Sequence, residues 1–178
     1  MDLAQVSFDT AFAQLIAPGE EGAYSTDPSD PGNWTGGYPG VGELKGTKYG
    51  ISAASYPRID IENLTPDGAK AIYFTDFWTR LNCNSLPAPL ASALFKCAVN
   101  IGVKPAARIL QGAISVAADS VIGQETVARV RSLNSDFVLS AFLGDVALRY
   151  TRDAGFVHDG RGWLRRVSLV AIQSGREQ

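Results

Sequence analysis

The stretch LASALFKCAVNIG, residues 90–102, predicts a helix with a strongly apolar face. Its apolar side chains recur at steps of three and four residues, which places them on one side of a helix. They are Leu90, Leu94, Phe95, Ala98 and Val99. Gly102 follows, and glycine commonly stands just beyond the last turn of a helix. We therefore expect the helix to end near residue 102.

Helical patterns continue on both sides of this stretch. Thr65-Pro66-Asp67 supplies an N-cap, a proline at the first helical position and an acidic first turn, which predicts a helix through Trp78. Apolar repeats predict further helices over 8–16, 105–114, 126–130, 135–150 and 161–172. Because strand patterns are weak throughout, the sequence predicts a mainly α protein.

Residues 20–50 differ from the rest of the chain. They contain eight of the 18 glycines, with Asp-Pro, Pro-Gly and Gly-Gly pairs that are typical of turns. We expect a long glycine-rich loop with at most a small β-hairpin. Loops of this length are usually functional or disordered, and Trp34, Tyr38 and Tyr49 favour a functional role.

The composition indicates one soluble globular domain, or two small lobes that are tightly joined. The 178 residues are 46% apolar and 19% charged. No run reaches the roughly 18 apolar residues of a membrane helix, and one His with two Cys excludes the usual zinc site. Cys83 and Cys97 are expected to be reduced thiols rather than a disulfide or a nucleophile. No metal or organic cofactor is expected.

Charge is unevenly distributed along the chain. Residues 1–95 contain 5 Lys and Arg and 11 Asp and Glu, which gives a net charge of −6. Residues 96–178 contain 11 Lys and Arg and 7 Asp and Glu, which gives +4, so the net charge of the chain is −2. This balance gives no overall positive field for nucleic acid. We expect an acidic lobe over 1–95 and a basic lobe over 96–178, packed as one globule.

In the first half of the chain a Glu, an Asp and a Thr follow one another in an order that suits a glycoside-cleaving site. Glu21 follows the helix breaker Pro18-Gly19 at the mouth of the loop, where partial desolvation would keep a carboxyl protonated as a general acid. Asp30 lies nine residues later and Thr47 follows, so a second carboxylate and a hydroxyl could orient a water. The alternatives are a solvated turn for Glu21 and an Asx turn for Asp30.

Three motifs in this region resemble glycoside hydrolase family 108. They are EGAYS at residues 21–25, DPSDPG at 27–32 and TKYGIS at 47–52. The resemblance continues through residues 95–102 and ends in GWLRR at 162–166, which is similar to the family's predicted peptidoglycan-binding segment. Members are N-acetylmuramidases, found as phage endolysins and as bacterial proteins once called secretion activators.

The resemblance implies a lysozyme-like fold and a role for each matched position. Glu21 falls on the family's general acid. By analogy with phage-type lysozymes, Asp30 is the second carboxylate and Thr47 orients the water. Tyr24 and Tyr49 stand in the motifs as sugar-binding candidates. Asn100 also matches, and it either binds an N-acetyl group or caps a neighbouring loop.

The chain departs from the family pattern at three places. Ala23 replaces a glycine, and Lys96 replaces an aspartate. Residues 33–46 are inserted between the second and third motifs, and they could supply Trp34 and Tyr38 as sugar-stacking faces or Glu43 as an unexpected second acid.

The resemblance predicts a monomeric hydrolase that cleaves the β-1,4 bond between N-acetylmuramic acid and N-acetylglucosamine in peptidoglycan strands. Two alternatives remain: an inactive wall-binding or secretion-associated protein, and a chitinase-like or chitosanase-like enzyme. The N-terminus lacks the pattern of a secretory signal. We therefore expect synthesis in the bacterial cytoplasm and action in the periplasm or wall after holin-type or dedicated export, without membrane insertion.

Overall fold

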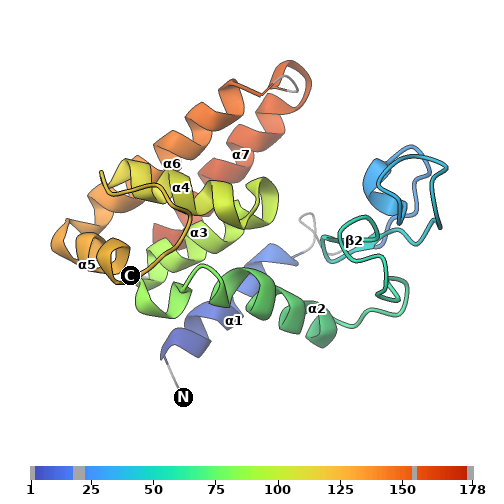
Figure 1. Cartoon of the computed structure of the whole chain (residues 1–178), viewed down its shortest axis with the longest axis horizontal. Helices are drawn as coiled ribbons and strands as arrows, with labels where there is room; N and C mark the ends of the chain where they lie inside the picture. Colours follow the sequence, from blue (N-terminus) through green and yellow to red (C-terminus); the bar gives the residue numbers. More distant parts are fainter. Residues whose placement is uncertain (1–2, 18–22, 154–155, 176–178) are drawn as a thin grey trace. The chain divides into compact units, whose positions relative to one another are not determined.

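The computed structural model describes residues 3–17, 23–153 and 156–175 of the chain. Its contacts divide the chain into two units. Phe12–Phe74 form what we call the hairpin unit, and Met1–Ala11 with Thr75–Gln178 form the helical unit. Figure 1 labels the main elements, of which α1 (Leu3–Leu15) crosses from one unit to the other.

α3 (Ala88–Ile101) is the central helix of the helical unit. The apolar face is buried as predicted, and burial extends to every residue from Leu90 to Ala98, including Ser92 and Lys96. α3 packs against α4 (Val103–Ala113), α6 (Ser135–Thr151) and α7 (Phe156–Gly175). Figure 1 shows α6 and α7 side by side, and α5 (Gln124–Ser132) packs against α6.

Three aromatic rings form the centre of this unit. Phe8 lies 5.2 Å from Trp78 and 5.7 Å from Phe95 between ring centroids, and Trp78 and Phe95 are 5.7 Å apart. All three side chains are buried. The Trp78 Nε1 donates a hydrogen bond to Asn84 Oδ1 at 2.6 Å, so the buried indole N–H keeps a partner.

A buried amide fixes the loop between α4 and α5. Gln111 Nε2 donates to Asp119 Oδ1 at 2.7 Å and to Val121 O at 3.0 Å, while Gln111 Oε1 accepts from Ser120 N at 2.9 Å. The bond from Gln111, followed by the one from Val121 N, holds the pKa of Asp119 below its ordinary value of 3.8.

Asp119→Ala is expected to destabilise the protein at neutral pH and to matter less in acid. Because the folded state favours the ionised carboxylate, its contribution is complete above about pH 4 and is lost as pH falls through the lowered pKa. Thermal unfolding of both proteins from pH 7 down to acid should show the difference in Tm shrinking below about pH 4. A difference that stays constant would contradict a charge-dependent role.

The hairpin unit contains a capped helix and a small sheet. Thr65 Oγ1 accepts from Gly68 N at 3.1 Å and caps α2 (Pro66–Tyr73), as predicted, and the chain continues as a π-helix over Phe74–Thr79. β1 (Thr47–Lys48) pairs antiparallel with β2 (Ile51–Ser52). Tyr49 and Gly50 join the strands with φ of 53° and 74°, the positive values that a two-residue turn needs to match the strand twist.

The mainly α prediction is confirmed, and so is the small hairpin. α7 begins at Phe156, earlier than the expected residue 161. The lobe boundary between residues 95 and 96 stays a prediction, and it falls within α3. In the described ranges, no helix is both long enough and apolar enough to cross a membrane.

Candidate active site

The motif at residues 27–32 forms two consecutive Asx turns. Asp27 Oδ1 accepts hydrogen bonds from Ser29 N at 2.9 Å and from Ser29 Oγ at 2.7 Å, which lowers the pKa of Asp27. Asp30 Oδ1 accepts from Gly32 N at 2.8 Å and caps the 3₁₀ turn Pro31–Asn33. Both carboxylates are exposed. The Asx geometry expected for Asp30 is therefore present, and it leaves the carboxylate open to solvent.

Gly32 brings the Asp30 carboxylate close to the sheet. A Cβ placed on Gly32 would lie 3.2 Å from Asp30 Oδ1 and 3.7 Å from Ser52 Cβ. Ser52 is the cross-strand partner of Thr47, and directly opposed residues project from the same face of a sheet. Asp30, the predicted second carboxylate, and Thr47, the predicted hydroxyl, therefore lie in one neighbourhood together with Ser52.

The first motif is joined to the third by a backbone bridge. Ser25 N donates to Thr47 O and Thr47 N donates to Ser25 O, both at 2.9 Å. Gly46 stands beside this bridge with φ of 82°, and a Cβ there would lie 2.4 Å from Ser25 O. Glycine is therefore required at residue 46 both by its backbone conformation and by the space available.

Tyr24 and Tyr49 share a cation. Lys48 Nζ lies 5.9 Å from the Tyr24 ring centroid and 5.6 Å from that of Tyr49, and it donates to Glu62 O at 2.6 Å. Partial burial, followed by the charges of Glu62 and Asp60, raises the pKa of Tyr24. The Lys48 ammonium therefore lies beside both phenol rings, and the Tyr24 side chain is 41% exposed.

The 33–46 insertion folds as a second hairpin. Trp34 pairs with Leu44, Thr35 N donates to Glu43 O at 3.0 Å, and Glu43 N donates to Thr35 Oγ1 at 2.9 Å. Tyr38 lies at the tip and is 71% exposed. The insertion therefore presents Tyr38 on a hydrogen-bonded arm.

The side chains of Trp34 and Glu43 are held by neighbouring groups. Trp34 Nε1 donates to Pro28 O at 2.9 Å, which ties the insertion to the second motif. Glu43 makes an ion pair with Lys45 at 3.0 Å and is 74% exposed. The role of Glu43 as a second acid stays a prediction.

Asn33 is a residue that the sequence pattern does not single out. Its side chain is fully buried, Nδ2 donates to Asp27 O at 3.0 Å, and its backbone oxygen accepts from Lys45 N and Gly46 N. Within the described ranges Asn33 Oδ1 has no hydrogen-bond partner. An asparagine inside a turn-rich segment carries no burial signal in sequence, so only the structure identifies it as the anchor of the insertion.

Residues 16–102 match the family model described as Glycosyl hydrolase 108. This region belongs to glycosyl hydrolase family 108. It contains the three motifs, the insertion and α3, so the resemblance seen in the sequence is confirmed. The match supports a peptidoglycan-degrading glycoside hydrolase in general.

A solved structure, titled "Structure of Brucella abortus SagA", is similar over almost the whole chain. The identity is 26%, the TM-score is 0.80, and the match covers 96% of this chain and 94% of that one. The lysozyme-like fold is therefore confirmed beyond the glycosyl hydrolase 108 region. No curated protein matches the chain.

Glu21 and Asn100 are the two remaining residues that the sequence predicts for the site. Glu21 lies outside the described residues, so its role stays a prediction. Asn100 is in the helical unit, on α3, where its Nδ2 donates to Lys96 O at 3.1 Å and its Oδ1 accepts from Arg166. Both polar atoms of the Asn100 amide are thus engaged within the helical unit, and its role toward substrate also stays a prediction.

Both cysteines of the glycosyl hydrolase 108 region are buried and free. Burial raises the pKa of the Cys83 thiol well above its usual range and that of Cys97 to about 12. Thiols in this state are unreactive at neutral pH. Across the described ranges, no three His, Cys, Asp or Glu side chains are placed to hold a metal ion.

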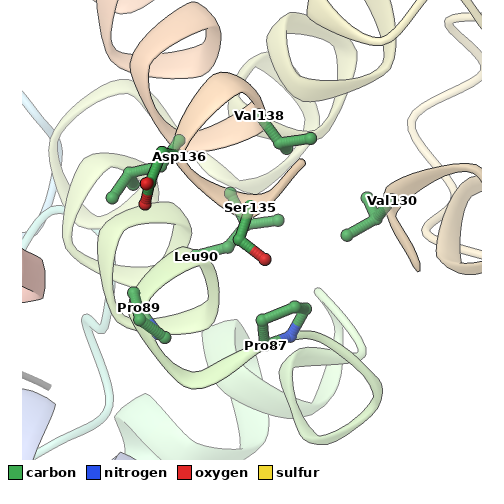
Figure 2. Close-up of a pocket in the computed structure, with 8 residues that line it drawn as sticks. Pro87, Pro89, Leu90, Val130, Ser135, Asp136 and Val138 are labelled. Atoms are coloured by element: carbon green, nitrogen blue, oxygen red, sulfur yellow. The ribbon is translucent and has the colours of Figure 1, made fainter. Parts of the chain in front are cut away.

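A cavity of about 330 Å³ lies in the helical unit, mostly beyond the glycosyl hydrolase 108 region. Its apolar lining comes from Pro87, Pro89, Leu90, Val130, Val138 and Leu139, and Ser135 and Asp136 also line it. Figure 2 shows the Ser135 hydroxyl pointing into the space between Pro87 and Val130. Neither Asp30 nor Thr47 is among the residues that line this cavity.

Proposed function

We propose that the protein is an N-acetylmuramidase that cleaves the β-1,4 bond between N-acetylmuramic acid and N-acetylglucosamine. The observation that carries this proposal is the glycosyl hydrolase 108 match over all three motifs. The grouping of Asp30 with the Thr47–Ser52 strand pair supports it, because glycoside hydrolysis needs groups on both sides of the scissile bond.

In this mechanism Glu21 protonates the glycosidic oxygen and so makes it a leaving group. A transition state with oxocarbenium character then develops at the sugar carbon. Asp30, whose carboxylate is exposed and fixed by Gly32 N, stabilises that charge or receives a proton from water. Thr47 supplies a hydroxyl on the neighbouring strand that orients the water.

Aromatic residues of the hairpin unit supply the sugar-binding faces. Tyr24 and Tyr49 present rings that flank the Lys48 ammonium, and Tyr38 presents an exposed ring on the inserted arm. Trp34, with its Nε1 bonded to Pro28 O, offers its ring face rather than its N–H. Apolar faces of sugar rings stack on aromatic side chains of this kind.

Asp30→Asn is expected to lower the rate of peptidoglycan hydrolysis by about 10²-fold or more without unfolding the protein. Asparagine preserves the N-cap of the 3₁₀ turn because its side-chain oxygen can still accept from Gly32 N, so the change removes only the charge. Initial rates on purified peptidoglycan, with Tm measured in parallel, test the expectation.

Asp27→Asn is the matched control for this experiment. Asp27 occupies the preceding Asx turn, and its carboxylate is already satisfied by Ser29. Its replacement should leave the rate within a few-fold of wild type. Equal rates for wild type and Asp30→Asn would remove Asp30 from the mechanism and direct the search to another partner for Glu21.

A further inference from the structure

A groove of about 400 Å³ lies between α4 and α6 in the helical unit. From α4 it is lined by Ile109 and Gly112, from α6 by Asp145, Leu148 and Arg149, and from the C-cap of α6 by Arg152. These last four residues stand at positions i, i+3, i+4 and i+7, so they share one face of the helix and its cap. This face therefore presents two guanidinium groups, one carboxylate and an apolar side chain together.

The charged side chains of the groove form no ion pair among the residues that the structure describes. Asp145 stands four residues before Arg149, the order and spacing that favour an ion pair on a helix. Nevertheless, neither Asp145, Arg149 nor Arg152 has an opposite charge within 4.0 Å among the described residues. Leu148, between them, is 52% exposed. Both signs of charge are therefore available to a ligand that carries both.

Building on the proposed function, we propose that this groove binds the peptide stem carried by the glycan. The two arginines suit a peptide carboxylate, because guanidinium forms paired hydrogen bonds with carboxylate oxygens. Asp145 suits the ammonium group of a diamino acid in the same peptide. Ile109 and Leu148 contact the methylene groups that join the two charges. The ligand is thus a short zwitterionic peptide.

Gly112 keeps the groove open. A Cβ placed on Gly112 would meet no atom within 4 Å, and its backbone is helical, so a larger side chain there enters the groove without displacing the protein. Gly144, on α6, is equally free of neighbours, and it does not line the groove. Gly112→Gln therefore blocks the groove, and Gly144→Gln is its matched control.

The test is calorimetric titration of the full chain with the tripeptide L-alanyl-γ-D-glutamyl-L-lysine. The wild type and Gly144→Gln should bind it with equal affinity. Gly112→Gln and the double variant Arg149→Gln/Arg152→Gln should bind it about tenfold or more weakly. Raising the salt concentration should weaken wild-type binding, since the contacts are ionic. Absence of wild-type binding, or equal binding by all four proteins, would overturn the proposal.

A second measurement separates this inference from the proposed function. Glycan strands from which the stems have been removed should be cleaved by all four proteins at equal rates, because the groove contacts only peptide. Stem-bearing strands should show a raised KM for Gly112→Gln with kcat unchanged. Cleavage of strands without tripeptide binding defeats the groove alone, while tripeptide binding without cleavage of strands defeats the proposed function alone.

Discussion

Glu21→Gln is expected to lower the rate of peptidoglycan hydrolysis by about 10³-fold or more. Glutamine has nearly the same shape as glutamic acid and cannot donate the proton that the leaving oxygen needs. Binding of the glycan and the fold should both be preserved, so Tm and sedimentation with insoluble peptidoglycan should match the wild type. The measurement is the initial rate of reducing-end release.

Glu20→Gln is the matched control, because it removes the same charge one residue earlier in the chain. It should retain activity within a few-fold of the wild type. A folded Glu21→Gln protein with a near wild-type rate would contradict the assignment of the general acid. Loss of activity in both variants would indicate that the net charge of the segment, rather than one proton donor, is required.

Gly46→Ala is expected to destabilise the hairpin unit by about 3 kcal/mol and to abolish activity. Its Cβ would lie 2.4 Å from Ser25 O and 2.8 Å from Tyr24 Cε2, and residue 46 also needs a positive φ. The Ser25–Thr47 bridge would have to break, which displaces the proposed water-orienting hydroxyl. Thermal unfolding and hydrolysis rates measure the two effects.

Gly40→Ala separates the backbone cost from the steric one. Gly40 has a φ of 80°, close to that of Gly46, but a Cβ there would meet no atom within 4 Å. Its replacement should therefore cost about 1 kcal/mol and leave the rate nearly unchanged. Equal losses for the two variants would show that φ alone, and not the contact with Ser25, fixes glycine at residue 46.

Local chemistry explains why the helices could be predicted from the sequence. Thr65-Pro66 predicts the start of α2, because Thr65 is a favourable N-cap and the structure has this cap. The apolar face of residues 90–102 predicts α3. The Asx turn of Asp30 could also be predicted from the sequence. An aspartate two residues before a glycine can accept a hydrogen bond from the backbone N–H of that glycine, and this local bond needs no distant group.

The arrangement of the insertion could not be predicted in the same way. Its hairpin depends on bonds between Thr35 and Glu43 and on the burial of Asn33, which contacts Asp27. Such pairings join residues that no periodic pattern connects, and the glycines that permit them also permit many other turns. The π-helix over Phe74–Thr79 could not be predicted either, because its sequence is equally typical of a continuation of α2.

The central claim is tested most directly by the ends that the protein leaves on digested peptidoglycan. The products are reduced with borohydride and then separated and weighed by mass spectrometry. A muramidase leaves N-acetylmuramic acid at the reducing end, so every released fragment should carry its reduced alcohol. Fragments that end in reduced N-acetylglucosamine, or intact peptidoglycan beside rapid cleavage of chitin or chitosan, would contradict the account.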